Sequence, residues 1–252
     1  MGFRKQNCWL KQIEMTFKRS FIIFLVVFVC VTACKKDENT VLELETSFIS
    51  DVDGNTYKTV KIGDQWWMTE NLNVKHFNDG SELNYVAIFQ DDTLWANSVG
   101  PSYTYLNDSI YGCLYNQSAV QDVRKLSPAG WHVATDDDWK KLEETIGMSS
   151  SEVEKLAWRG VAQAENLFSI NSEGWPIQTV PFGSNKYKMN VLPSGCKLFN
   201  GQSSTNGNAA FFWTSTKIAD EAYYRHFDYK QKTIYRQHTY NQYGMSIRCV
   251  KD

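Results

Sequence analysis

The final 42 residues contain four segments with the pattern of β-strands, and this strong β character is the main constraint on the fold. The segments are residues 211–216, 222–229, 233–238 and 245–250, which short polar turns join. In the second segment, Tyr223, Arg225, Phe227 and Tyr229 alternate with Tyr224, His226 and Asp228. Since successive side chains of a strand point to opposite faces, this strand is predicted to carry two unlike faces.

An earlier β region surrounds an Asp-Gly pair. Asp53-Gly54 lies between residues 48–52 and 56–62, and Asp-Gly is typical of tight hairpin turns. The same segment resembles the start of a calcium loop, but the positions that need Gly and Glu hold Thr56 and Ile62. We therefore predict a hairpin.

Residues 73–110 have weaker patterns and are predicted to form long loops with short strands.

A helix is predicted to begin after Thr135, which can cap it. Residues 136–138 are three aspartates, and they suit the positive end of the helix dipole. The apolar face of this helix consists of Trp139, Leu142 and Ile146, and Gly147 follows as a stop. Glu143 and Glu144 are assigned to the exposed face.

A second helix is predicted from Ser151, with Gly160 as its stop. Glu154 stands three residues after Ser151, which is the spacing of a capping box. The inward positions of this helix would be Val153, Leu156 and Ala157. One further strand is predicted at residues 186–192, inside a region rich in Gly, Ser, Asn and Pro.

The N-terminal segment has the pattern of a bacterial lipoprotein signal. Lys18 and Arg19 precede an apolar run at residues 21–31, which is too short to cross a bilayer but suits a signal peptide. The small residues Thr32-Ala33 then precede Cys34. We predict that residues 1–33 are removed, with Met15 as an alternative start, and that lipid on Cys34 anchors the protein to the membrane. The alternatives are a secretory signal with an incidental cysteine and an uncleaved anchor.

Residues 34–46 are polar and are predicted to form a tether. Within them, Lys35-Lys36-Asp37-Glu38 resembles the surface-export signal of Bacteroidota lipoproteins. That resemblance implies an outer-membrane lipoprotein exposed on the cell surface. The alternative is that this segment is only a solvated tether with no role in export.

Charge and composition exclude some classes of partner. The leader holds five of the 26 basic residues but one of the 28 acidic residues, so residues 34–252 are acidic and nucleic acid is not expected to bind. No Cys-x-x-Cys pair occurs and the four histidines are scattered, so neither a metal nor a cofactor is predicted. The 219 residues after the leader suffice for one large domain, placed at residues 47–252.

Six sequence blocks occur in the order found in one known family. They are DVDGNTY (51–57), IGDQWWMTENL (62–72), YGCLYN (111–116), PAGWHV (128–133), FWTST (212–216) and YGMSIRCV (243–250). Together they resemble the Fibrobacter succinogenes major paralogous domain from about residue 50 onward. This family occurs in secreted and surface lipoproteins, so the resemblance implies an architecture rather than a reaction.

The resemblance implies an α+β, C-type-lectin-like fold with two helices and a mostly antiparallel, irregular sheet with long loops. Many relatives have a cysteine where this chain has Ser127, and that cysteine is expected to bond the one in the terminal block. The resemblance therefore leaves Cys249 either free or with another partner. Cys113 is the first candidate for a disulfide with Cys249, and Cys196 is the second.

The tryptophans are candidates for sugar binding. Trp66 and Trp67 would point to opposite faces of a strand, and Trp131, Trp139 and Trp213 fit the core. Trp95, Trp158 and Trp175 lie in less patterned sequence and are candidates for an exposed ligand-binding platform, with core packing as the alternative. The Glu-Pro-Asn, Gln-Pro-Asp and Trp-Asn-Asp motifs of sugar-binding C-type lectins do not occur in the chain.

No set of residues commits the chain to a reaction. The aspartates at 136–138 would diverge on a helix, and the Gly-x-Ser-x-Gly motif does not occur. We therefore predict a lipid-anchored binding or adhesion module for a polysaccharide or another surface protein. A hydrolase or redox-modifying enzyme on the same fold, and a purely structural envelope lipoprotein, are the alternatives.

Overall fold

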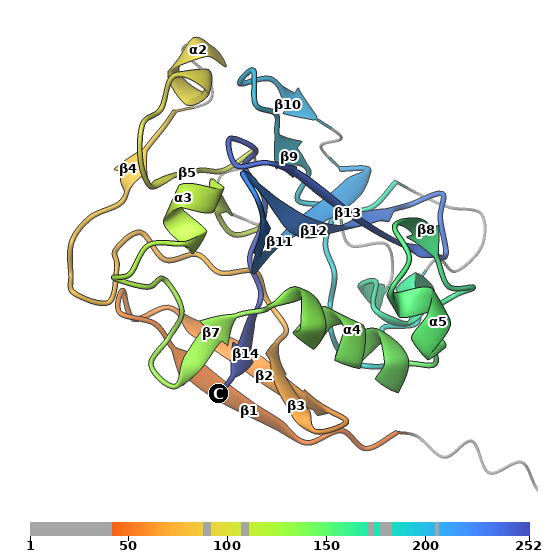
Figure 1. Ribbon diagram of the computed structural model, residues 1–252. Helices are drawn as coiled ribbons and strands as arrows, with labels where there is room; N and C mark the ends of the chain where they lie inside the picture. The colour runs from red at the N-terminus through yellow and green to blue at the C-terminus, as the bar shows by residue number, and fades with distance from the viewer. Residues whose placement is uncertain (1–41, 88–91, 107–110, 171–173, 177–182, 205–206) are drawn as a thin grey trace, which may run out of the picture. The chain divides into compact units, whose positions relative to one another are not determined.

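A long antiparallel hairpin opens the fold, as the Asp53-Gly54 pair predicts. The computed structural model describes residues 42–87, 92–106, 111–170, 174–176, 183–204 and 207–252, which belong to one compact unit, Leu42–Asp252 (Figure 1). The predicted signal peptide, the lipidated Cys34 and residues 34–41 of the tether lie outside the described residues. Within the described part, no helix is both long and apolar enough to cross a membrane.

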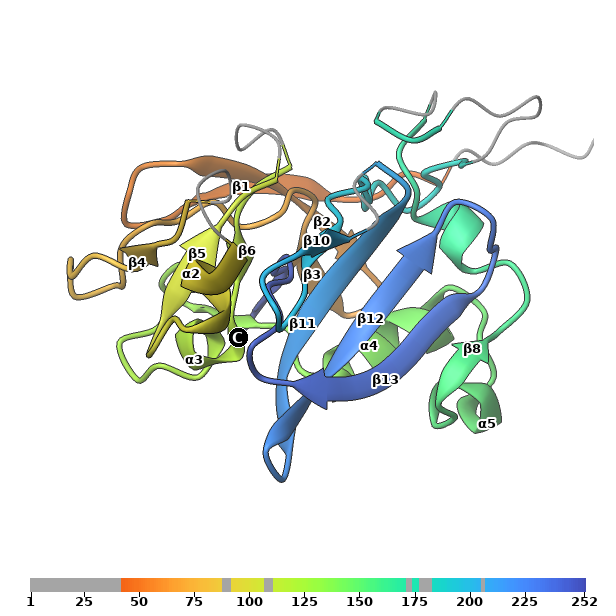
Figure 2. The same cartoon turned by 90° about the horizontal axis from the view of Figure 1, so that it is seen from above.

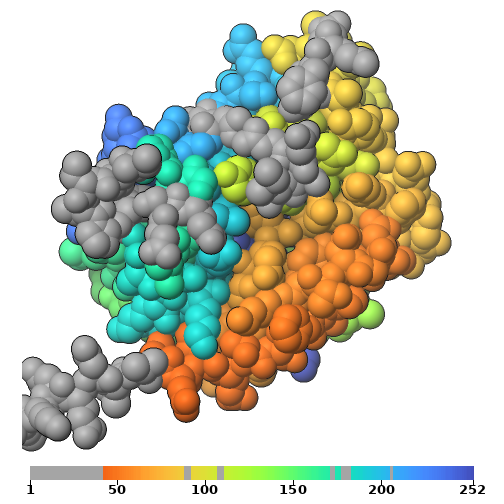
Figure 3. Space-filling model, turned by 180° about the vertical axis from the view of Figure 1, so that it is seen from behind, coloured from red at the N-terminus to blue at the C-terminus, as the bar shows by residue number. Residues whose placement is uncertain are grey.

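The first sheet contains five strands in the order β1-β2-β3-β14-β7. Their bounds are Thr46–Ser50 for β1, Thr56–Ile62 for β2, Gln65–Met68 for β3, Cys249–Lys251 for β14 and Trp131–Val133 for β7. All the pairs are antiparallel, and the last strand of the chain lies between elements that are far from it in sequence. The β1–β2 hairpin, orange in Figure 3, lies on the surface of the unit.

The second sheet contains four strands in the order β11-β12-β13-β8. These strands are Ala209–Ile218 (β11), Glu221–Asp228 (β12), Ile234–Tyr240 (β13) and Ala157–Arg159 (β8), and every pair is antiparallel. The three predicted strands at 211–216, 222–229 and 233–238 are therefore confirmed. The fourth predicted strand, at 245–250, is reduced to β14 and belongs to the other sheet, because its residues pair with β3 and β7.

Short elements fill the rest of the described chain. One small sheet holds β4 (Asn84–Tyr85), β5 (Ser102–Thr104) and β6 (Leu114–Tyr115), with β4 parallel to β5, and another holds β9 (Cys196–Lys197) and β10 (Ser203–Ser204). The helical elements are α2 (Asp92–Ala96), α3 (Gln117–Val120), α4 (Asp136–Thr145), α5 (Ser150–Val153) and the 3₁₀ turn η1 (Ala164–Asn166). The class is therefore mixed α and β with mostly antiparallel sheets, although the strands divide among several sheets instead of one.

Helix α4 begins as its sequence predicts. The Thr135 hydroxyl accepts a hydrogen bond from the Asp138 backbone N–H, and the Asp138 carboxylate accepts one from the Thr135 backbone N–H, which makes a capping box. Trp139 is fully buried and its ring lies 5.0 Å from Trp67 of β3 and 5.5 Å from Phe212 of β11. Helix α4 therefore contributes to the core that both large sheets share.

Two local predictions need correction. The second helix is present as α5 and buries Val153, as predicted, but it is much shorter than expected. Helix α5 has four residues, its cap Ser149 makes no side-chain capping bond, and Leu156 and Ala157 are exposed. The chain leaves the helix there because Ala157 adopts a positive φ of 65° and starts β8. Residues 186–192 form no strand; Val191 alone makes a parallel bridge, to Phe168.

A buried arginine fastens the terminal block to the rest of the unit. Arg248 donates from Nε to Asn71 Oδ1 at 2.7 Å and from Nη1 to the carbonyls of Met68 and Met189 at 3.0 and 2.8 Å. Burial lowers the pKa of Arg248 to about 10, which still leaves the guanidinium charged at neutral pH. These bonds join the end of the chain to Met68 of β3, to Asn71 just after that strand and to the distant Met189, which positions β14 in the first sheet.

Candidate functional site

The four-stranded sheet has two chemically different faces. Arg225 and Phe227 of β12 point toward helix α4, where Phe227 lies 6.1 Å from the Trp139 ring. Tyr224 and His226 of the same strand point the other way, as the sequence alternation predicts. In Figure 2, α4 lies behind the sheet, and no described helix lies over β12 and β13 on the side that faces the viewer. We call these the inner face and the outer face.

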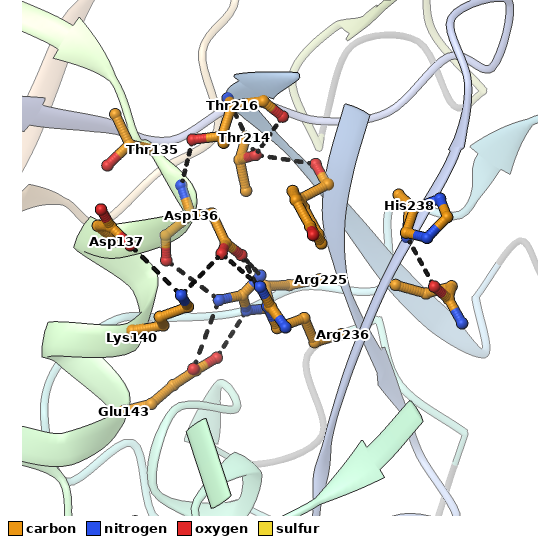
Figure 4. Close-up of polar contacts among 12 residues, drawn as sticks. Thr135, Asp136, Asp137, Lys140, Glu143, Thr214, Thr216, Arg225, Arg236 and His238 are labelled. Atoms are coloured by element: carbon orange, nitrogen blue, oxygen red, sulfur yellow. Dashed lines mark hydrogen bonds and ion pairs between the residues drawn. The ribbon is translucent and has the colours of Figure 1, made fainter. Parts of the chain in front are cut away.

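Charged side chains converge on the inner face (Figure 4). Arg225 donates to Glu143 Oε1 and to Asp136 Oδ1, both at 2.7 Å. Arg236 of β13 binds Asp136 through two nitrogens, at 2.9 and 2.7 Å, and Arg159 of β8 donates to Glu143 Oε2 at 2.7 Å. Three strands are thus tied to two carboxylates of α4.

This ion-pair network is closed to solvent. Glu143 is 0% exposed, so its assignment to the exposed face of the helix is wrong; arginines from β8 and β12 reach it instead. Burial alone would raise the pKa of Asp136, but the hydrogen bonds from Arg236 and the charge of Arg225 outweigh burial and lower it. Asp136 is therefore ionised. Arginines occupy the oxygens of both carboxylates, whose role is to position the sheet.

The outer face carries a row of aromatic side chains in register across all four strands. Phe211 of β11 pairs with His226 of β12, His226 pairs with Tyr235 of β13, and Tyr235 pairs with Trp158 of β8. Phe211 stacks on His226 with ring centroids 4.2 Å apart, and Trp158 lies 5.1 Å from both His226 and Tyr235. We call these four residues the aromatic row.

The aromatic surface continues beside the row. Tyr224 lies 6.3 Å from Phe211 and 6.2 Å from Tyr235 between ring centroids. Tyr243 packs against the same small apolar cluster as Phe211 and Tyr224, and it lies 5.8 Å from the ring of Phe199. Phe199 is exposed, so the aromatic surface reaches solvent at this end as well as at Trp158.

The aromatic side chains of the outer face also carry polar atoms that can form hydrogen bonds. Within the described residues, the phenol hydroxyls of Tyr224 and Tyr235 make no hydrogen bond. Nε2 of His226 is buried without a partner. Burial lowers the pKa of His226 to about 4, so its ring is neutral at physiological pH. The outer face thus combines apolar rings with uncharged hydrogen-bonding groups.

The three candidate tryptophans do not form one exposed platform. Trp95 of α2 is 1% exposed and its indole N–H donates to the Gln242 carbonyl at 2.7 Å. Trp175 is 4% exposed and donates to the Val191 carbonyl at 3.0 Å. Both serve the core, and the prediction of an exposed platform is wrong for them because backbone carbonyls of distant segments satisfy their indoles. Trp158, at 38% exposed, lies in the aromatic row.

The cysteines within the described residues are all free and buried. Cys113 and Cys249, the expected disulfide pair, belong to the same apolar cluster, yet no bond joins them and the Cys113 thiol donates to Asn73 Oδ1 at 3.1 Å. Cys196 packs in a different cluster. Burial raises the pKa of Cys113 and of Cys196 to about 12, so these thiols stay protonated.

A second surface feature is a cleft of about 300 Å³ that brings serine, histidine and aspartate side chains together. Its lining includes Ser215, His132 and Asp252. His132 binds Asp252 through Nδ1 at 2.7 Å and Asp138 through Nε2 at 2.9 Å, while the Ser215 hydroxyl donates to the Val133 carbonyl. Since both imidazole nitrogens are engaged by carboxylates, His132 is not placed to activate Ser215.

Sequence patterns alone missed most of the aromatic row. The alternation in residues 222–229 put Tyr224 and His226 on one face, which was the available signal. The sequence does not show that β8 continues this face and aligns Trp158 with Tyr235, because that pairing joins residues 75 or more positions apart. Among the described residues, no group of three or more potential ligands could hold a metal ion.

Comparison with known proteins identifies the family. Neither the curated proteins nor the solved structures yielded a significant match. The model of the Fibrobacter succinogenes major domain matches residues 60–251, which covers both large sheets except β1 and the first residues of β2. The six sequence blocks that suggested this family all overlap the matched segment, apart from the first at residues 51–57. The chain therefore belongs to the Fibrobacter succinogenes major domain family.

Proposed function

We propose that this protein is a lipid-anchored polysaccharide-binding module of the bacterial cell envelope, with a C-type-lectin-like architecture. The observation that carries the proposal is the aromatic row, which is half-buried to exposed on the outer face of the four-stranded sheet. Aromatic rings bind the apolar faces of sugar rings, while phenol and amide groups exchange hydrogen bonds with sugar hydroxyls. A fixed row across four strands offers both without rearrangement of the backbone.

The ion-pair network supports the same proposal from the inner face. It joins α4 to β8, β12 and β13, and these are the strands that hold His226, Tyr235 and Trp158 in line. A binding site on rigid elements loses less conformational entropy when a ligand arrives. The network is therefore proposed to preorganise the outer face.

Affinity electrophoresis of residues 42–252 through gels that contain polysaccharides tests the binding proposal. This unit contains all three apolar clusters, so it is expected to fold without the leader. Trp158→Ala and Tyr235→Ala should weaken retention about tenfold, a loss of about 1.4 kcal/mol. Phe48→Ala, which removes an exposed ring from β1 in the other sheet, is the matched control and should bind as the parent does.

Two results would count against polysaccharide binding. One is a folded unit that is retained by no glycan in a broad panel. The other is retention that is the same in the parent and in Trp158→Ala. Capture of a single envelope protein through the aromatic row, with no glycan bound, would replace the polysaccharide with a protein partner.

The anchor and the location need a separate test. Cells that express the full chain and receive a radiolabelled fatty acid should label the protein, and Cys34→Ser should abolish both the label and recovery in the outer-membrane fraction. Digestion of the protein by protease added to intact cells would support exposure on the surface. Label that persists in Cys34→Ser would contradict attachment at this residue.

A further inference from the structure

We propose that the outer face selects uncharged polysaccharides over acidic ones. This inference rests on the proposed function, because it names the chemical class of ligand that the aromatic row would take. Three observations support it. The outer face carries almost no charge, polar atoms around the aromatic row lack partners, and the charged side chains of the same strands lie on the inner face.

The outer face is almost free of charge. Its residues on the paired strands that are not fully buried are Phe211, Tyr224, His226, Tyr235, Gln237, Thr239 and Trp158, together with Lys217 and Asp228. Ala209, Trp213 and Ala222 also belong to this face but are fully buried. Lys217 stands beyond the irregularity that follows Trp213 in β11, and Asp228 ends β12 at the opposite end of the face. Between them lie about two rows of side chains with no ionised group.

The same strands place their charges on the inner face. Glu221 and Arg225 of β12 and Arg236 of β13 all point inward, where Arg225 and Arg236 meet the carboxylate of Asp136. Because strand alternation sends each of these charges away from the outer face, the neutrality of that face is a consequence of the pairing register. A shift of one residue would bring the arginines to the surface.

The absence of charge on the outer face determines which class of ligand would bind to it with a favourable free energy. A carboxylate or sulfate group that leaves water for this face would lose hydration and meet no cation in return. A neutral sugar exchanges water for ring contacts and for hydrogen bonds with the hydroxyls of Tyr224 and Tyr235, which make none within the described residues. The amide of Gln237 lies beside Tyr224 in the register and adds a further donor.

The test compares ligands of opposite character with the full chain in detergent. The neutral panel is β-glucan, xyloglucan, galactomannan and starch, and the acidic panel is polygalacturonate, hyaluronan and chondroitin sulfate. We expect retention by at least one neutral polymer and by no acidic polymer, with less than about a twofold change between low and high salt, because no ion pairs would form. Preference for an acidic polymer, or binding that salt abolishes, would overturn the inference.

A pair of variants separates this inference from the proposed function. Gln237→Glu places a carboxylate beside Tyr224 without removing a ring, and it should weaken binding of the neutral polymer at least about fivefold. Gln231→Glu adds the same charge in the exposed turn between β12 and β13 and should leave binding unchanged. If acidic polymers bind and Trp158→Ala abolishes that binding, the proposed function stands and the selectivity fails. If no polymer of either panel binds, both fail.

Discussion

Arg225 and His226 are consecutive residues of β12 that belong to opposite surfaces of one sheet. Arg225 is fully buried and holds two carboxylates of α4, while His226 stacks on Phe211 in the aromatic row. The peptide unit between them joins the stabilising network to the candidate binding face. Changes on the inner face are therefore expected to affect binding through the geometry of the row.

The first prediction concerns the buried network. Arg225→Met keeps much of the side-chain volume but leaves Glu143 and Asp136 without their shared partner, so it should lower the free energy of unfolding by about 3–5 kcal/mol. Urea denaturation followed by tryptophan fluorescence measures this loss. Lys61→Met breaks the exposed pair with Glu45 and should cost less than about 1 kcal/mol. Equal effects of the two variants would show that the network contributes little.

The second prediction concerns acid. Burial would raise the pKa of Asp138, but hydrogen bonds from His132 and Thr135 outweigh it and lower the pKa to about 2. The unfolded aspartate has a pKa of about 3.9, so the folded state binds fewer protons between the two values. Asp138 therefore adds stability at and above about pH 5, and this contribution is lost as the pH falls from about 5 to 2.

Thermal unfolding between pH 2 and 7 measures the contribution of Asp138. The parent should lose stability steeply below about pH 4, and Asp138→Asn should be less stable at pH 7 but flatter in the acid range. Asp137→Asn is the matched control, because that side chain is exposed on the same helix turn. An acid profile of Asp138→Asn parallel to that of the parent would contradict this assignment.

The third prediction concerns the thiols. Cys113, Cys196 and Cys249 are buried and burial raises the pKa of each, so the folded unit 42–252 should react slowly with iodoacetamide at pH 8. In denaturant without reductant, mass spectrometry should find all three alkylated. Recovery of a single free thiol in denaturant would instead reveal a disulfide, which peptide mapping would assign.

The fourth prediction compares two glycines with positive φ. Gly112 has a φ of 77°, and an added Cβ would lie 2.8 Å from Asn71 Cβ and 2.9 Å from the Leu72 carbonyl oxygen. Gly54 has a φ of 82° with open space around it. Gly54→Ala should cost about 1–2 kcal/mol for its left-handed backbone alone, and Gly112→Ala should cost clearly more because Asn71 and the backbone of Leu72 must also move. Equal melting temperatures for the two variants would refute this difference.

Local patterns in the sequence predicted the elements that local forces govern. The Asp53-Gly54 turn, the cap at Thr135 and the alternation in β12 all depend on residues within a few positions of one another. Family resemblance added the identity of the domain, which the match over residues 60–251 confirms. The leader and Cys34 remain predictions, because they lie outside the described residues.

Only the tertiary structure decided how distant segments meet. Glu143 looks like a solvent-facing helix residue, yet it is buried because Arg225 arrives from 82 positions away to neutralise it. Trp158 looks no different from Trp95 and Trp175, yet it alone of the three is placed by strand pairing on the outer face. The periodicity of a sequence shows toward which face of a strand a side chain points. The residue that lies beside it on the neighbouring strand depends on the register between strands that are remote in sequence. That register brings the four residues of the aromatic row together.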